Sequence, residues 1–158
     1  MKSRLKNYDY STCGTYFITI CTLGKQNRFW KSVGATDGRP PDCDCMQNIE
    51  LSPCGMIVDE AINNISSVHP ALSVDCYVIM PNHIHLLLRV CTDDHGRPMV
   101  APTMSRVVNQ LKGYVSRRVD ATVWQKSFYD HIIRNAADDE EHRNYIYENP
   151  IRWRCNKP

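Results

Sequence analysis

The order of the predicted elements indicates an α+β fold, in which a split βαβ unit builds an antiparallel sheet and a C-terminal helix follows. Four segments are rich in β-branched and aromatic residues, and two amphipathic segments separate them in the order strand, helix, strand, strand, helix, strand. A third helical segment closes the chain. With 158 residues there is room for one hydrophobic core, so residues 1–158 are expected to form a single domain.

The first strand is expected at residues 16–23, which are aromatic, β-branched or apolar at nearly every position. Residues 24–50 contain several glycines, prolines and scattered charges, and this composition predicts a long loop with an insertion at about 31–50. Ser52 is a suitable N-cap, and Pro53 favours the first helical position. A helix is therefore expected over about 52–67.

Two further strands are expected on either side of Pro81, at residues 74–80 and 82–90, as a tight antiparallel pair. Thr103 is expected to cap a second helix, whose apolar stripe comprises Met104, Val107, Val108, Leu111 and Val115. A short strand at 128–134 and a helix at 138–148 complete the chain, and Asn149-Pro150 is expected to stop that helix. This order is the ferredoxin-like pattern.

The composition indicates where in the cell the protein is expected to be found. The chain has no signal peptide and no run of about 20 apolar residues, so we expect a soluble cytoplasmic protein with no membrane partner. The eight cysteines are then expected to be free thiols. Cys43, Cys45 and Cys54 form a cluster, but the spacing of the first two is too short for the usual zinc knuckle.

Basic residues concentrate in the second half of the chain, although the net charge is only +2. Near them lie aromatic residues such as Trp124 and Trp153, a combination suited to phosphates and unstacked bases. The alternative is a solvated helix face. The candidates for contacts with DNA are Arg106, Lys112, Arg117, Arg118, Arg152 and Arg154.

His83 and His85 are two residues apart on a predicted strand and therefore project from the same face. Their Cα atoms would be roughly 7 Å apart, which allows both imidazoles to reach one ion. The alternative is a pair of ordinary half-buried histidines. Because the strand is strongly apolar, these side chains need partners, and a metal ion is one such partner.

Tyr114 falls at the edge of the apolar stripe of the second helix. It is either a tyrosine that buries its ring and exposes its hydroxyl, or a nucleophile that attacks a phosphodiester beside a metal. The second interpretation places its hydroxyl on the sheet face that bears His83 and His85.

The segment Met80-Pro81-Asn82-His83-Ile84-His85-Leu86-Leu87-Leu88 resembles the signature of the single-tyrosine HUH transposases, in particular the branch of REP-associated tyrosine transposases. Three later blocks resemble that family in the same order, and the resemblance covers about residues 15–153. These blocks are Gln110-Leu111-Lys112-Gly113-Tyr114, residues 123–134, and Tyr145-Ile146-x-x-Asn149-Pro150.

The resemblance implies a strand transferase that cleaves and rejoins single-stranded DNA, often at hairpins. His83 and His85 would hold Mg²⁺ or Mn²⁺, and Tyr114 would form a 5′-phosphotyrosine bond. In the family a polar residue one helical turn after the tyrosine, often Gln or Asn, tends to complete the metal site. After Tyr114 that position is Arg118, which offers no acceptor, so water or Gln110 would have to serve.

Arg118 keeps a second hypothesis open, namely a catalytically impaired relative that only binds single-stranded nucleic acid. A third hypothesis is a zinc-binding structural or hydrolytic protein that uses the histidines and cysteines. The oligomeric state stays open between a monomer and a homodimer.

Overall fold

The computed structural model describes residues 13–31, 49–91 and 103–155. Its elements, in chain order, are β1 (Gly14–Cys21), a short 3-10 helix η1 (Leu23–Lys25), α1 (Pro53–Asn63), α2 (Ile65–Val68), β2 (Leu72–Ile79), β3 (His83–Val90), α3 (Met104–Val119), β4 (Tyr129–Ile132) and α4 (Ala136–Cys155).

The four strands form one antiparallel sheet in the order β2-β3-β1-β4. Strand β3 pairs with β2 through the hairpin at Pro81 and with β1 on its other side, where Thr19 lies opposite His85 and Cys21 opposite His83. This order confirms the predicted ferredoxin-like split βαβ arrangement with an added C-terminal helix.

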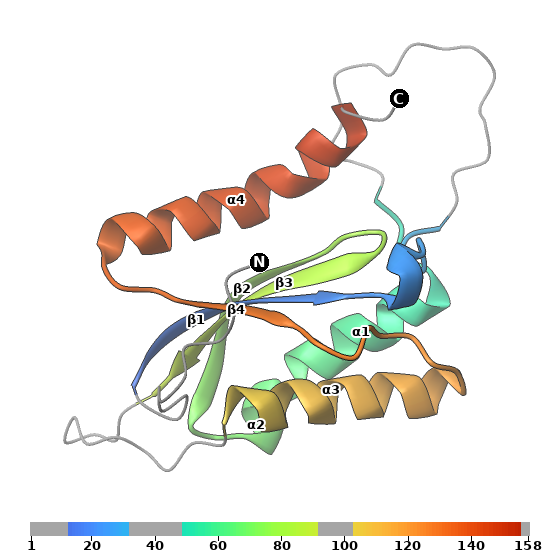
Figure 1. The fold of residues 1–158 in the computed structure, drawn as a ribbon, viewed down its shortest axis with the longest axis horizontal. Coiled ribbons are helices and arrows are strands. Elements are labelled where there is room, and N and C mark those ends of the chain that lie inside the picture. The colour runs from blue at the N-terminus through green and yellow to red at the C-terminus, as the bar shows by residue number, and fades with distance from the viewer. Residues whose placement is uncertain (1–12, 32–48, 92–102, 156–158) are drawn as a thin grey trace.

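The two faces of the sheet carry different side chains because successive strand residues point in opposite directions. Ile18 and Ile20 of β1 and Leu86 of β3 belong to the large core, which α1 and α3 cover. Phe17 and Leu87 point the other way and pack with Ile146 of α4. Figure 1 shows α1 and α3 on one side of the sheet and α4 alone on the other.

The helix starts follow the predicted capping. Ser52 Oγ accepts a hydrogen bond from Gly55 N–H at 3.0 Å, and Thr103 Oγ1 accepts one from Arg106 N–H at 3.4 Å. The first helix is shorter than expected, since α1 ends at Asn63 and the short helix α2 follows a break at Asn64. Asn64 and Asn63 are weak helix formers, which agrees with a break at this point.

The predicted end of the last helix is wrong. Helix α4 passes through Pro150 and continues to Cys155. Proline removes one backbone hydrogen bond from a helix, but the Pro150 side chain is buried, and Arg152 pairs with Glu148 across it at 2.6 Å. Tyr145 and Asn149 consequently lie on one continuous helix, a full turn apart.

Most of the predicted insertion, residues 32–48, lies outside the described residues, and so do Cys43 and Cys45. Its two ends meet, because Trp30 forms a β-bridge with Leu51 and Lys31 N–H donates to Glu50 O at 2.9 Å. The segment therefore leaves and re-enters the fold at one place. Among the helices in the described part of the chain, none has the length and apolarity needed to cross a membrane.

Candidate functional site

His83 and His85 share one face of β3, as the strand alternation predicted. Their ring centroids are 4.7 Å apart in an edge-on arrangement. The face is the one that α4 covers: the His85 ring stacks on Phe17 at 5.2 Å, and the His83 ring lies 6.0 Å from Trp153 of α4.

Each histidine uses Nδ1 for a hydrogen bond within the protein. Asn82 Oδ1 can only accept, so His83 Nδ1–H donates to it at 2.6 Å. His85 Nδ1 lies 2.7 Å from Thr19 Oγ1 on the neighbouring strand. Neither contact uses Nε2, the other ring nitrogen. His85 Nε2 is buried with no hydrogen-bond partner among the described residues. This pattern is typical of histidines that ligate a metal through Nε2.

Burial keeps both imidazoles neutral. It lowers the pKa of His83 to about 4, with repulsion from Lys25 adding to the effect. Burial also lowers the pKa of His85 to about 3, helped by repulsion from His83 and His142. A metal ligand must be unprotonated, so both rings are ready to bind a cation at neutral pH.

Helix α4 brings a tyrosine to these histidines. The Tyr145 ring centroid is 5.1 Å from that of His85 and 6.1 Å from that of Phe17. Tyr145 is 42% exposed, so its side chain is accessible from solvent. Asn149 lies one turn further along α4, and its buried Nδ2 has no hydrogen-bond partner within the described ranges.

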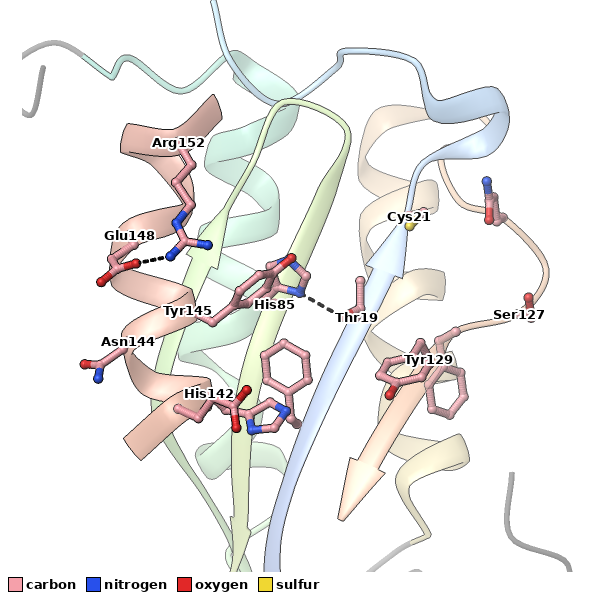
Figure 2. Close-up of a pocket in the computed structure, with 14 residues that line it drawn as sticks. Thr19, Cys21, His85, Ser127, Tyr129, His142, Asn144, Tyr145, Glu148 and Arg152 are labelled. Atoms are coloured by element: carbon pink, nitrogen blue, oxygen red, sulfur yellow. Dashed lines mark hydrogen bonds and ion pairs between the residues drawn. The ribbon is translucent and has the colours of Figure 1, made fainter. Parts of the chain in front are cut away.

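A cleft of about 640 Å³ opens beside Tyr145. Phe17, Thr19 and His85 contribute to its lining from the sheet. Helix α4 forms one wall, and Gln125, Ser127, Phe128 and Tyr129 form the opposite wall. Figure 2 shows Tyr145 and Arg152 reaching from α4, with Ser127 and Tyr129 across the cleft.

The expectation that Tyr114 points to the histidines is wrong. Helix α3 packs with α1 on the opposite face of the sheet, and the Tyr114 hydroxyl donates to Glu60 Oε1 of α1 at 2.7 Å. Arg118 donates to the same hydroxyl at 3.0 Å. The hydrogen bond to Glu60 raises the pKa of Tyr114, which makes its phenol a poorer nucleophile. The helical stripe located the edge position correctly, but it did not determine which face of the sheet the helix covers.

The six basic candidates do not gather in one patch. Of them, only Arg152 lines the cleft beside Tyr145. Arg106 and Arg117 line a separate groove between α2 and α3, and Arg118 is engaged with Tyr114 and Glu60. The other two also have contacts of their own: Lys112 donates to backbone carbonyls, and Arg154 lies over the Trp30 ring.

Comparison with known proteins gives a consistent answer. No protein-family model matches the chain. An uncharacterized protein of Haemophilus influenzae is 29% identical across 95% of this chain and 87% of its own length. The REP-associated tyrosine transposase of Escherichia coli is 28% identical over 50% of this chain, a match that spans 44% of that relative. A second Haemophilus influenzae protein, provisionally assigned to the same class, is 32% identical over 47% of each chain.

The solved structure of a REP-associated tyrosine transposase bound to a REP hairpin superposes with a TM-score of 0.63 at 21% identity, and covers 96% of this chain and 74% of that one. The chain is thus similar to REP-associated tyrosine transposases in sequence over about half of its length and in fold over nearly all of it. The fold and the family resemblance that the sequence suggested are thereby confirmed.

The sequence does carry a signal for Tyr145 and Asn149 of α4. Tyr145 and Asn149 belong to the last of the four blocks that resemble the REP-associated tyrosine transposases. Asn149 lies one helical turn after Tyr145. Asn149 therefore stands one turn after Tyr145 as Arg118 stands one turn after Tyr114, and Asn149 carries the acceptor that Arg118 lacks.

Sequence reasoning also missed a second cluster, formed by His131 of β4 with Asp138 and His142 of α4. Their potential ligand atoms lie within 4.8 Å of one another. His131 Nε2 contacts both carboxylate oxygens of Asp138 at 3.0 Å, and His142 Nδ1 lies 2.8 Å from Asp138 O. The two imidazoles stack with centroids 4.6 Å apart. Since these ring nitrogens already have partners, the cluster fastens the start of α4 to β4.

Proposed function

We propose that this protein cleaves and rejoins single-stranded DNA, with Tyr145 as the nucleophile and His83, His85 and Asn149 as the metal site. The observation that carries the proposal is the 5.1 Å separation of the Tyr145 and His85 rings, on the cleft-bearing face of the sheet. The hairpin-bound relative supports hairpin-bearing DNA as the substrate.

The residues fit a divalent cation. His85 Nε2 is buried and unpaired in the described structure, and so is the Asn149 amide nitrogen. The nitrogen and oxygen of an amide exchange places on rotation, so Asn149 can offer Oδ1 as a hard ligand. Mg²⁺ or Mn²⁺ held here would polarise the scissile phosphate and stabilise its negative charge. Because two imidazoles are soft ligands for Mg²⁺, the DNA and water would supply the remaining oxygens.

Tyr145 performs the covalent step in this proposal. Its phenolic oxygen forms a bond to the scissile phosphorus, and the bond from that phosphorus to the 3′ oxygen breaks. The phenol proton passes to solvent, and the departing 3′ oxygen takes a proton from solvent to become a hydroxyl. The DNA 5′ phosphate is then held on Tyr145, and a 3′ hydroxyl can reverse the step without ATP.

The walls of the cleft supply positioning. The Phe17 ring of the sheet packs against two rings of α4, with centroids 6.1 Å from Tyr145 and 4.6 Å from His142. This packing sets the distance between α4 and the sheet. Arg152 also lines the cleft and pairs with Glu148 at 2.6 Å. We assign Arg152 to a DNA phosphate, since its guanidinium has donors beyond the one used by Glu148.

The test compares three tyrosine variants in Mn²⁺ with a hairpin-bearing single strand. Tyr145→Phe should eliminate a denaturant-resistant protein-DNA adduct, because it removes the attacking oxygen and little else. Tyr147→Phe is the matched control: Tyr147 lies on the same helix and is 61% exposed. Tyr114→Phe tests the competing assignment and should leave the adduct unchanged.

Mass spectrometry of trypsin-digested adduct locates the DNA independently. Cleavage after Arg143 and Arg152 gives peptide 144–152, whereas Tyr129 falls in peptide 127–134 and Tyr114 in peptide 113–117. DNA on peptide 144–152 that disappears in Tyr145→Phe supports the proposal. DNA on another peptide, or cleavage by Tyr145→Phe at the normal rate, would reject it.

The hypothesis of an impaired relative rested on Arg118, and under this proposal Asn149 rather than Arg118 takes the position one turn after the nucleophile. It stays in the experiment as an outcome, in which the strand binds and no adduct forms. The zinc hypothesis needs histidines and cysteines at one site. Cys54 is half-buried in α1, on the face of the sheet away from the histidines, so it does not share a site with them.

A further inference from the structure

The wall of the cleft opposite α4 is the segment from Gln125 to Tyr129, which joins α3 to β4. Gln125, Ser127, Phe128 and Tyr129 all line the cleft. Figure 2 shows Ser127 and Tyr129 on the far side of the cleft from Tyr145. A strand whose phosphate lies at Tyr145 would therefore place a neighbouring nucleotide against this segment.

Lys112 of α3 binds the backbone carbonyls of this segment. Its ammonium lies 2.8 Å from Gln125 O, 3.1 Å from Ser127 O and 3.4 Å from Lys126 O. An ammonium has three donors, and three carbonyls take them all. Lys112 also lies 6.0 Å from the centre of the Phe128 ring. Partial burial lowers its pKa, in agreement with a cation withdrawn from solvent.

The backbone of Gln125 is fixed from both sides. Its carbonyl accepts from Lys112, and its N–H donates to Cys21 O of β1 at 2.9 Å. Gln125 is half-buried and belongs to the lining of the cleft, and its side-chain amide has no hydrogen-bond partner in the described part of the protein. An amide offers one donor and one acceptor side by side, the pair that adenine matches through N7 and N6. Tyr129 adds an aromatic side chain on which a base can stack.

We propose that Gln125, Ser127, Phe128 and Tyr129 form a subsite for one unstacked adenine of the bound strand, which Gln125 reads through its amide and which Lys112 supports as a positioning residue. This proposal rests on the proposed function for the path of the strand. It removes Lys112 from the residues that contact phosphate, and it gives the cleft a source of sequence preference beside the scissile phosphate.

The experiment selects DNA from a library in which a fixed hairpin is flanked by about twelve randomised single-stranded nucleotides. All proteins carry Tyr145→Phe, so binding is measured without cleavage. We expect enrichment of adenine at one position near the hairpin. Gln125→Ala should reduce that enrichment roughly tenfold and leave the other positions unchanged. Adenine retained at full enrichment in Gln125→Ala would overturn the proposal, and so would enrichment of a different base at the position that Gln125 controls.

Lys112→Met separates positioning from phosphate contact, with Lys126→Met as the matched control from the exposed surface of the same segment. A positioning role predicts that Lys112→Met flattens the enrichment and leaves the salt dependence of affinity unchanged. A phosphate contact predicts the reverse, with the slope of log affinity against log salt reduced by about 0.7. Lys126→Met should keep the enrichment. If Lys112→Met fails to fold, as judged by its melting curve, Gln125→Ala alone decides the proposal.

Selection by binding keeps this inference separable from the catalytic one. If no adduct forms on Tyr145 but the enrichment depends on Gln125, the proposed chemistry fails and the subsite stands. If the adduct forms and the enrichment is independent of Gln125, the chemistry stands and the subsite fails.

Discussion

The contact between Thr19 and His85 makes a specific prediction about metal affinity. Thr19→Val keeps the shape of the side chain on β1 and removes the only hydrogen-bond partner that His85 Nδ1 has among the described residues. His85 then has two options. It can keep the proton on Nδ1 as an unpaired buried donor, or it can move the proton to Nε2, the nitrogen assigned to the metal.

The structure sets the size of both effects. His85 is 4% exposed, so water cannot replace the lost partner, and an unpaired buried donor costs about 1–3 kcal/mol of folding free energy. The proton shift would limit that cost but would withdraw the Nε2 lone pair from the site. Loss of such an orienting partner typically lowers metal affinity by about 10- to 100-fold. We therefore expect a larger change in metal affinity than in stability.

Calorimetric titration with Mn²⁺ and a thermal melt measure the two quantities on the same protein. Thr15→Val is the matched control, because Thr15 lies on the same strand and the same face, opposite Arg89 rather than a histidine. The control should change neither the affinity nor the melting temperature appreciably. Mn²⁺ affinity of Thr19→Val within twofold of the original, or an equal loss in Thr15→Val, would refute the assignment of Thr19 as the orienting group.

Three further predictions follow from the same face of the sheet. Asn149→Ala should weaken Mn²⁺ binding roughly tenfold in the same titration, with folding retained, and unchanged affinity would exclude Asn149 as a ligand. In the unfolded chain these two histidines take up protons near pH 6.5, whereas in the folded protein the pKa of His83 is about 4 and that of His85 about 3. The unfolded state therefore binds more protons between these values, so the free energy of unfolding should rise with pH up to about 6.5 and fall on acidification. Urea unfolding across this range checks the sign, and replacing both histidines with Asn should flatten the curve. Asp138→Asn should cost about 1–2 kcal/mol in a urea melt, because the carboxylate accepts from His131 and from Arg134 N–H at 2.9 Å, and a neutral result would show that the cluster does not hold α4.

The sheet was predictable because its information is local. The alternation of residues along β1 and β3 determines which side chains share a face, so the pairing of His83 with His85 followed from spacing alone. The caps at Ser52 and Thr103 also depend on neighbours three residues away. Features that depend on residues two or three positions apart can be predicted without knowledge of the tertiary structure.

Helix α4 was less predictable because its packing is not apolar. Only Ile146 and Pro150 are fully buried along its 20 residues. Its sheet-facing side instead carries Tyr145, which packs on an imidazole and on Phe17. Hydrophobic periodicity cannot detect a polar and aromatic face of this kind. The rule that proline ends a helix also failed, because the cost of the lost hydrogen bond was offset by tertiary packing.

The choice between Tyr114 and Tyr145 shows what a sequence leaves open in a two-sided sheet. A helical stripe shows which side of a helix meets the sheet, but both faces of this sheet have a helix layer, and no local pattern assigns a helix to one of them. The chemistry of the faces does make the assignment. The side with Ile84 and Leu86 needs an apolar partner, which the stripe of α3 provides. The side with His83 and His85 needs polar and aromatic partners, which α4 provides. Considered together, the histidine spacing and the composition of the last helix therefore favour the proposed Tyr145 over Tyr114.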